Sequence, residues 1–164
     1  MSKKVFTEEQ RFTQWWLWVL LIASLAGMTA AFISDYEPTT EYLLSMTSGY
    51  GILLLVILLL ANLKLKSRID ENGIQLNFWP FIRNKHIEWQ ALEKAEVVKY
   101  SPLQDYGGWG YRFTFGSKGK AVNVKGNMGI KLYFKSGKPF LIGTQKAEEA
   151  RAVLSQYQTK KETF

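Results

Sequence analysis

The 164-residue sequence contains no cysteine and a single histidine, His86. Without cysteine the chain has no disulfide framework, no cysteine-ligated zinc and no thiol nucleophile. One histidine leaves little room for a histidine-ligated metal site or a serine–histidine–aspartate triad. The stretch 116–120 is too short for a phosphate-binding loop and lacks the Ser or Thr that must follow its lysine. The sequence therefore predicts no enzymatic activity, no metal site and no cofactor.

Charged residues are missing from two long apolar stretches, residues 15–33 and 42–63. At a rise of ~1.5 Å per residue, helices of these lengths reach roughly 28 and 33 Å, the thickness of a bilayer's hydrocarbon core. A buried helical hairpin of a soluble protein is one alternative, although such helices normally carry a polar stripe. A cleaved signal peptide is an alternative for the first stretch, but Glu8 and Glu9 do not suit its basic leader. We predict two retained transmembrane helices.

Basic residues flank these stretches and are absent between them. The flanking set is Lys3, Lys4, Arg11, Lys64, Lys66 and Arg68. Residues 34–41 instead carry the carboxylates Asp35, Glu37 and Glu41. Because Lys and Arg near membrane spans stay on the cytoplasmic side, residues 1–14 and the C-terminal region are predicted to be cytoplasmic, with the connecting loop outside. This charge pattern predicts a multi-pass membrane protein with both termini in the cytoplasm.

Small residues recur at four-residue spacing in both apolar stretches: Ala23 and Gly27 in the first, Ser45 and Gly49 in the second. This spacing lets two helices approach closely, and the short connection requires them to be antiparallel. Neither stretch contains a carboxylate, lysine or histidine, so a proton or ion pathway has no residues to use.

From Lys64 onward the hydrophobic period changes to two, which is typical of half-buried strands. Alternation is clearest over residues 74–78, 111–115 and 130–134, and glycine-containing turns separate these runs. We predict about eight short strands in an antiparallel sandwich or open barrel. An amphipathic helix over residues 145–158, capped by Thr144, and a tail over 159–164 complete the chain.

Several short motifs together resemble bacterial pleckstrin-homology-like domains, in particular the membrane-anchored kind with two N-terminal spans. They are Asn72-Gly73-Ile74, His86-Ile87-Glu88-Trp89, Tyr106-Gly107-Gly108-Trp109-Gly110-Tyr111-Arg112, Gly126-Asn127-Met128-Gly129 and Ile142-Gly143-Thr144-Gln145. The likeness covers residues 64–158 and implies a seven-stranded bent sheet with a C-terminal helix and a binding or assembly role without catalysis. It also implies a location in the bacterial inner membrane. Phosphoinositide-binding members carry basic residues at the first hairpin, but here the turn 70–73 holds two carboxylates. That activity is therefore not expected.

Two groups of residues are candidate contacts. The first is a glycine-rich loop in which amides beside Arg112 form an anion nest or Trp109 anchors a partner protein; its residues are Tyr106, Gly107, Gly108, Trp109, Gly110 and Arg112. The alternative is a bulged strand where only glycine fits. The second is Lys64, Lys66 and Arg68, which contact an anionic membrane surface if they share one face of a strand, or serve only as topology signals. His86 is expected on the surface, where a strand begins.

Residues 64–164 hold 18 Lys and Arg against nine Asp and Glu, a net charge of +9. Attachment beside acidic phospholipid explains this sign, and we expect no nucleic-acid binding. The sequence predicts a membrane-anchored binding or assembly module whose partners are the bilayer and either a second copy or another membrane-associated protein. It identifies no small-molecule ligand. The alternatives are an anionic-lipid sensor and an accessory subunit of a membrane transport or secretion complex.

Overall fold

The computed structural model describes residues 4–34, 36, 39–114 and 117–159. The chain forms two compact units. The helical hairpin comprises Phe12–Leu63, and the β domain comprises the chain up to Arg11 together with everything from Lys64 onward. The hairpin is therefore inserted into the sequence of the β domain after its first strand. This revises the predicted division, in which residues 1–14 were a separate segment ahead of the first span.

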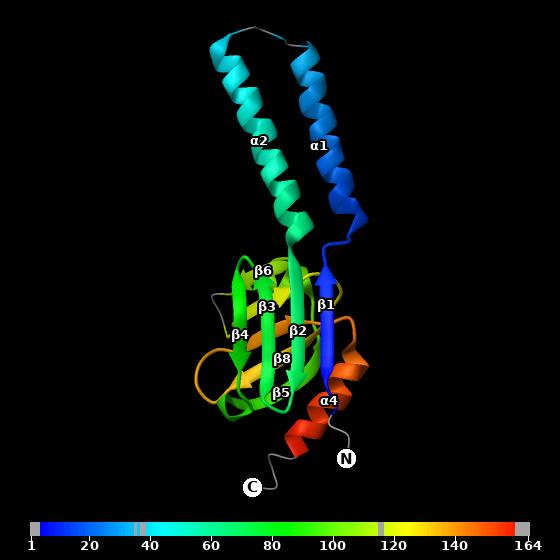
Figure 1. Ribbon diagram of the computed structural model, residues 1–164, viewed down its shortest axis with the longest axis vertical. Coiled ribbons are helices and arrows are strands. Elements are labelled where there is room, and N and C mark those ends of the chain that lie inside the picture. Colours follow the sequence, from blue (N-terminus) through cyan, green and yellow to red (C-terminus); the bar gives the residue numbers. More distant parts are fainter. Residues whose placement is uncertain (1–3, 35, 37–38, 115–116, 160–164) are drawn as a thin grey trace. The chain divides into compact units, whose positions relative to one another are not determined.

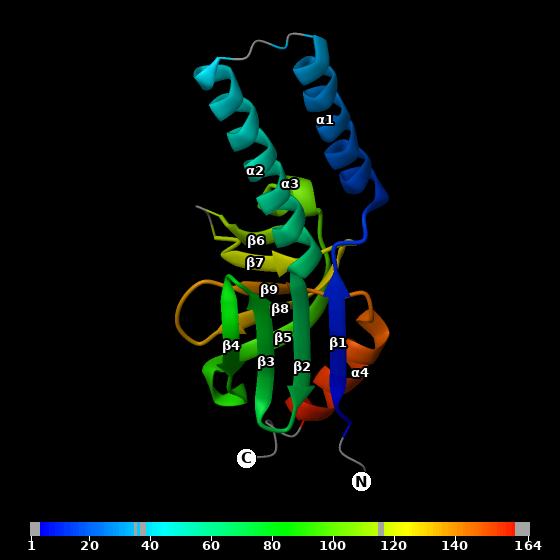
Figure 2. The same cartoon turned by 45° about the horizontal axis from the view of Figure 1, so that its top comes forward.

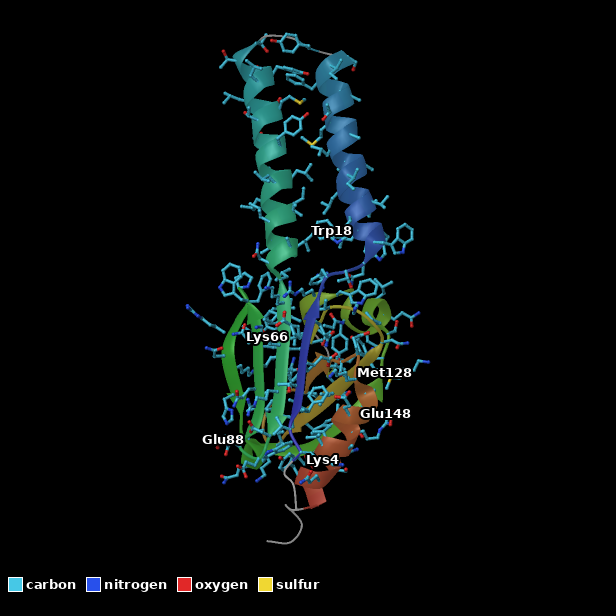
Figure 3. All side chains as sticks on the ribbon, turned by 45° about the vertical axis from the view of Figure 1, so that its right-hand side comes forward. Lys4, Trp18, Lys66, Glu88, Met128 and Glu148 are labelled. Carbon is cyan, nitrogen blue, oxygen red and sulfur yellow. The ribbon has the colours of Figure 1, made fainter. Side chains whose placement is uncertain are left out.

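The helical hairpin consists of α1 (Trp15–Ser34) and α2 (Thr40–Asn62), close to the predicted limits. Neither helix has a buried residue anywhere along its described length. Figure 3 shows their side chains both between the two helices and on their outer sides, with Trp18 labelled on α1. This exposure contradicts the buried-hairpin alternative, and both helices are long and apolar enough to cross a membrane. Asp35 and Glu37, predicted in the connecting loop, lie outside the described residues.

A few side chains join α1 to α2. A Cβ atom added at Gly49 would lie 2.7 Å from Cε of Met28, so glycine permits this approach. Thr29 Oγ1 and the Tyr50 hydroxyl are 3.2 Å apart and share a hydrogen bond. Gly27 has no neighbour within 4 Å of the equivalent position. The small-residue prediction therefore holds for Gly49 and not for Gly27.

The first sheet of the β domain contains β1 (Phe6–Arg11), β2 (Lys64–Asp70), β3 (Gly73–Trp79) and β4 (Ile82–Ile87) in that order, all antiparallel. These strands run side by side in Figure 1. Sequence analysis missed β1, although its residues alternate between buried and exposed. The reason is that the inward positions of β1 include Glu8 and Gln10, which hide the apolar alternation.

The second sheet has the order β5-β8-β9-β7-β6. Its strands are β5 (Leu92–Lys99), β6 (Gly110–Phe113), β7 (Lys120–Asn123), β8 (Met128–Phe134) and β9 (Phe140–Gly143). Its strands run across those of the first sheet in Figures 1 and 2. The described chain has eight strands from Lys64 onward, as predicted. With β1 it has nine in two sheets, which differs from the seven that the family resemblance implied.

The all-antiparallel prediction is wrong at one place, because β7 and β9 pair in parallel. Two short helices, η1 (Trp89–Ala91) and α3 (Pro102–Tyr106), flank β5. The predicted strand position Phe115 lies outside the described residues. The C-terminal helix α4 (Ala147–Thr159) starts two residues later than predicted and carries Glu148 and Glu149 in its first turn, as expected.

The core of the β domain lies between the sheets and under α4. Fully buried side chains come from both sheets: Phe6, Leu65, Ile69, Ile74, Leu76, Phe78, Val122, Ile130, Leu132, Leu141 and Ile142. The helix α4 buries Ala150, Val153 and Leu154 on the predicted face. At ~1.5–3 kcal/mol for each large apolar side chain, this burial is the main stabilising contribution to the β domain.

Hydrogen bonds tie β1 to the other end of the chain. The buried Glu8 carboxylate accepts from the Thr144 hydroxyl at 2.6 Å and from the Gln145 backbone N–H at 2.7 Å. Gln10 Nε2 donates to the Gly143 carbonyl at 2.7 Å. Thr144 Oγ1 also accepts from the Lys146 N–H at 3.1 Å, just ahead of α4. The strand that precedes α1 is therefore an integral part of the β domain.

Candidate functional site: a polar groove on the β1–β4 sheet

The outer face of the β1–β4 sheet carries two rows of polar side chains. Because the inward positions of β2 and β3 are filled by core residues, the intervening residues face outward. Cross-strand register aligns the first row as Thr7, Arg68, Gln75 and His86, and the second as Glu9, Lys66 and Asn77. Figure 3 labels Lys66 on this sheet. The sheet thus places polar groups from distant parts of the sequence side by side.

These two rows line an open groove of about 580 Å³. Its walls also include Asn84 of β4, whose side-chain oxygen accepts from Asn77 Nδ2 at 2.7 Å. Asn84 has a φ of 44°, and the register shifts between Leu76 and Phe78 opposite it. This local irregularity keeps the Asn84 amide beside the second row. The groove offers amide, hydroxyl, cationic and carboxylate groups, which suit hydrogen bonding to a polar partner.

Charges in the groove are mostly balanced by neighbours. Glu9 accepts from Arg11 at 2.9 Å and pairs with Lys66 Nζ at 3.1 Å. These hydrogen bonds, first that of Arg11 and then that of Lys66, hold the pKa of Glu9 below its usual value. Arg68 Nε lies 3.0 Å from the Asp70 carboxylate. The cations are therefore held in place beside carboxylates and retain donors for a ligand.

The three residues predicted to contact the membrane are spread along the length of β2. Lys64, Lys66 and Arg68 share one side of β2, as the alternation predicted, but Lys66 and Arg68 line the groove. At a rise of ~3.3 Å per residue, Arg68 lies roughly 13 Å along the strand from Lys64. Only the Lys64 position, opposite Arg11 and Trp79, is at the end of β2 that follows α2. Their joint contact with a membrane surface stays a prediction.

His86 lies near the end of β4, not at the start of a strand as predicted. Its side chain is exposed, in agreement with the prediction, and it stands opposite Gln75 at the rim of the groove. No signal in the sequence linked His86 to Arg68, because their proximity follows from the register of three strands.

The glycine-rich loop is organised by the end of α3. Gly107 has a left-handed φ of 71° and its N–H donates to the Leu103 carbonyl at 2.9 Å. The Gly108 N–H donates to the Pro102 carbonyl at 2.8 Å. Both amides thus cap the helix, which leaves them unsuited to the predicted anion nest. The cap explains the glycine at position 107, whereas Gly110, the first residue of β6, needs glycine for its own φ of 105°.

The remaining loop residues are also held by local contacts. Tyr106 is buried, and its hydroxyl donates to the Lys118 carbonyl at 3.4 Å. Trp109 is half-buried, and its carbonyl accepts from Arg112 Nε at 2.9 Å. A Cβ atom added at Gly108 would lie 3.2 Å from the Arg112 guanidinium, so Arg112 folds back over the loop. The role of this loop in partner binding stays a prediction.

Sequence analysis also missed a group of aromatic side chains, which we call the aromatic edge: the exposed Trp79, Phe81 and Phe113 and the half-buried Tyr111. Trp79, Phe81 and Phe113 are 53%, 52% and 60% exposed. Phe81 stacks on the buried Phe78 with ring centroids 5.8 Å apart and lies 6.4 Å from Tyr111. Tyr111 contacts Phe113 edge-on at 4.7 Å. The available signal was the sequence Trp-Pro-Phe at a turn, where polar residues are usual.

Within the described ranges, no three His, Asp or Glu side chains group as metal ligands. The groove and the aromatic edge are surfaces suited to binding: one is polar and hydrogen-bonding, the other apolar. Comparisons of the chain with protein-family models, with curated proteins and with solved structures give no match.

Proposed function

We propose that this chain is a non-enzymatic, membrane-anchored binding module of the bacterial inner membrane. The helices α1 and α2 cross the membrane, both termini are cytoplasmic, and the β domain stands at the cytoplasmic surface. There the groove on the β1–β4 sheet binds a polar segment of a membrane-associated partner protein. The pleckstrin-homology-like character inferred from the motifs is part of this proposal.

The observation that carries the proposal is the pairing of β1 with β2. Arg11 lies opposite Lys64 in this ladder. Arg11 precedes the start of α1 by four residues, and Lys64 follows the end of α2 by two. One sheet therefore holds the segment that leads into α1 and the segment that follows α2. If the helices span a bilayer, these ends and the β domain must be on the same side.

Charge supports the choice of the cytoplasmic side. Arg11 and Lys64 form the paired strand ends, and the chain from Lys64 onward has a net charge of +9. Positive residues adjoining a span favour the cytoplasmic side. The pairing argument and the charge argument are independent, because the first uses strand register and the second uses composition.

Thiol labelling in intact cells tests this topology, since a chain without cysteine accepts a single reporter. The positions are Tyr36→Cys between the helices, Asn72→Cys in the β2–β3 turn and Lys4→Cys ahead of β1. A membrane-impermeant maleimide is expected to label Tyr36→Cys in spheroplasts, and the other two only after permeabilisation. Labelling of Asn72→Cys or Lys4→Cys in intact spheroplasts contradicts the proposed orientation.

The partner surface is tested separately with a cysteine-linked benzophenone. The groove position is Gln75→Cys, the loop position is Trp109→Cys, and the matched control is Glu93→Cys on exposed β5. Illumination of native membranes is expected to give discrete adducts from Gln75→Cys and none from Glu93→Cys. Adducts at Trp109→Cys alone would show that the partner binds the glycine-rich loop and not the groove, which contradicts the proposed binding surface. Absence of adducts at both sites removes the proposed binding role.

A further inference from the structure

The strand register fixes how far the aromatic edge lies from the end of α2. Asn62 is the last residue of α2, and Lys64 is the first residue of β2. Two residues of chain span at most about 7 Å. Trp79 pairs with Lys64, and neighbouring strands lie about 5 Å apart. By chain reach alone, the Trp79 backbone is therefore within roughly 12 Å of the last residue of α2.

If α2 ends at the edge of the hydrocarbon core, this upper limit places the Trp79 backbone inside the headgroup layer, which extends roughly 5–8 Å beyond that core, or within about 7 Å of it. Because Trp79 ends β3 and Phe81 lies in the turn that follows, the Phe81 side chain starts from the same end of the sheet. The opposite end, at the β2–β3 turn around Asn72, is separated from it by the full length of β3. One end of the sheet is thus confined near the membrane surface while the other is not.

The exposed groups at the confined end have the chemistry of a membrane interface. Trp and Tyr rings favour the boundary between hydrocarbon and headgroups because they combine an apolar body with a polar tip. Phe rings beside them enter the acyl side of the same boundary. Contacts from Phe81 through Tyr111 to Phe113 form a continuous surface that joins both sheets. The Lys120 ammonium lies 5.1 Å from the centroid of Phe113 and adds a cation suited to phosphate headgroups.

Phe81 is also held in its exposed position by the fold. Its ring stacks on Phe78, which is fully buried between the sheets. Contacts with Phe78 and Tyr111 within the β domain therefore hold the Phe81 ring in place. Fixed, half-exposed aromatic rings are unfavourable in water but favourable in the headgroup region.

We infer that the aromatic edge is a membrane-interface contact: Trp79 and Phe81, extended by Tyr111 and Phe113, rest in the headgroup layer of the bilayer that α2 crosses. This inference rests on the proposed function, because it requires α2 to span the membrane. Its consequence is that the β domain is held in a defined orientation against the lipid. A hydrophobic contact of this kind does not require anionic lipid, unlike the predicted contact through Lys64, Lys66 and Arg68.

Fluorescence quenching of the full chain in vesicles tests the inference. Single cysteines carry an environment-sensitive nitrobenzoxadiazole label at Phe81→Cys and, with every aromatic ring kept, at the neighbouring Arg83→Cys. Asn72→Cys is the control at the far end of the β2–β3 hairpin, and Ile52→Cys reports the middle of α2. The vesicles contain phosphatidylcholine alone or mixed with phosphatidylglycerol, and spin-labelled phosphatidylcholine is the quencher.

Emission from Phe81→Cys and Arg83→Cys is expected to fall by about half, against less than about a tenth for Asn72→Cys, in both lipid mixtures. Quenching at Ile52→Cys without quenching at Phe81→Cys and Arg83→Cys overturns the inference but leaves the membrane anchor intact. Equal quenching at Asn72→Cys also overturns it, since the contact is then not specific to the aromatic edge. Absence of quenching at Ile52→Cys overturns the anchor itself, and the inference with it.

Discussion

The helical hairpin and the β domain place their apolar residues in opposite ways. In the β domain, Leu65, Ile74 and Phe78 are 0% exposed, and α4 covers the core with one apolar face. In the hairpin, Ile52, Leu55 and Leu58 are 64%, 67% and 53% exposed. The β domain thus covers its apolar surface with its own chain, whereas the hairpin relies on cover from its surroundings. Equal substitutions in the two regions should therefore have unequal consequences.

A core truncation should produce the largest effect. Replacing Phe78 by Ala removes a ring that is 0% exposed and is expected to lower the free energy of unfolding of the β domain by about 3–5 kcal/mol. Leu58→Ala in α2, which is 53% exposed, is the matched control and should leave that free energy unchanged within about 0.5 kcal/mol. Chemical denaturation in detergent micelles, followed by near-ultraviolet circular dichroism, measures both. Equal destabilisation contradicts the separation into two units.

A charge introduced into the hairpin should have the opposite pattern: it should impair membrane insertion, whereas the same charge on the β domain should not. Ile52 lies near the middle of α2, so Ile52→Arg is expected to disfavour membrane insertion by about 3 kcal/mol. Gln75→Arg on the exposed face of β3 is the control, and insertion should not change. The fraction of chain that resists carbonate extraction from membranes measures the difference. Full extraction resistance of Ile52→Arg contradicts a spanning role for α2.

The elements that the sequence predicted were those whose signals are local. The two long apolar helices, most of the strands and α4 were found because hydrophobic period and length are visible over ten to twenty residues. The strand β1 was missed because Glu8 and Gln10 occupy its inward positions, and their partners are residues 143–145. A polar residue satisfied by such a distant partner looks like a surface residue in the sequence alone.

The candidate surfaces were harder to predict than the fold. The groove arises from register across four strands, one of which precedes both helices, so no spacing in the sequence brings Thr7 close to Gln75. The glycine-rich loop was visible as a motif, but the amides of Gly107 and Gly108 cap α3. The aromatic edge joins Phe81 of the β3–β4 turn to Tyr111 of β6. The groove and the aromatic edge both depend on contacts between segments that are far apart in the sequence, and no local pattern of residues reveals such contacts.

The polar link between β1 and α4 should have an intermediate effect. Glu8→Ala removes the acceptor for the Thr144 hydroxyl and the Gln145 N–H, leaving both donors unsatisfied near the core. The expected loss in unfolding free energy is about 1–3 kcal/mol. Glu9→Ala, next to it on the exposed side, should change the unfolding free energy much less than Glu8→Ala because surface ion pairs contribute little.

Hydrogen exchange distinguishes a local from a global effect of Glu8→Ala. If β1 belongs to the β domain, amides of β2 and of the first turn of α4 should exchange faster in this variant, whereas amides of α1 should not change. Unchanged protection in β2 and α4 contradicts the assignment of β1 to the β domain.

The smallest predicted effect appears at alkaline pH and again concerns the β domain alone. Tyr100 is 8% exposed, and burial raises the pKa of its hydroxyl to about 12, against the opposing effect of the hydrogen bond from Asn123. Because the folded pKa is above the unfolded value of about 10, this contribution to stability is present below pH 10 and is lost as the pH rises toward 12. At pH 11 the loss should be about 1.4 kcal/mol.

Tyr100→Phe lacks this titration, so its stability should fall less between pH 9 and 11 than that of the wild type, as measured by urea denaturation at each pH. Parallel pH profiles for the two proteins contradict the raised pKa.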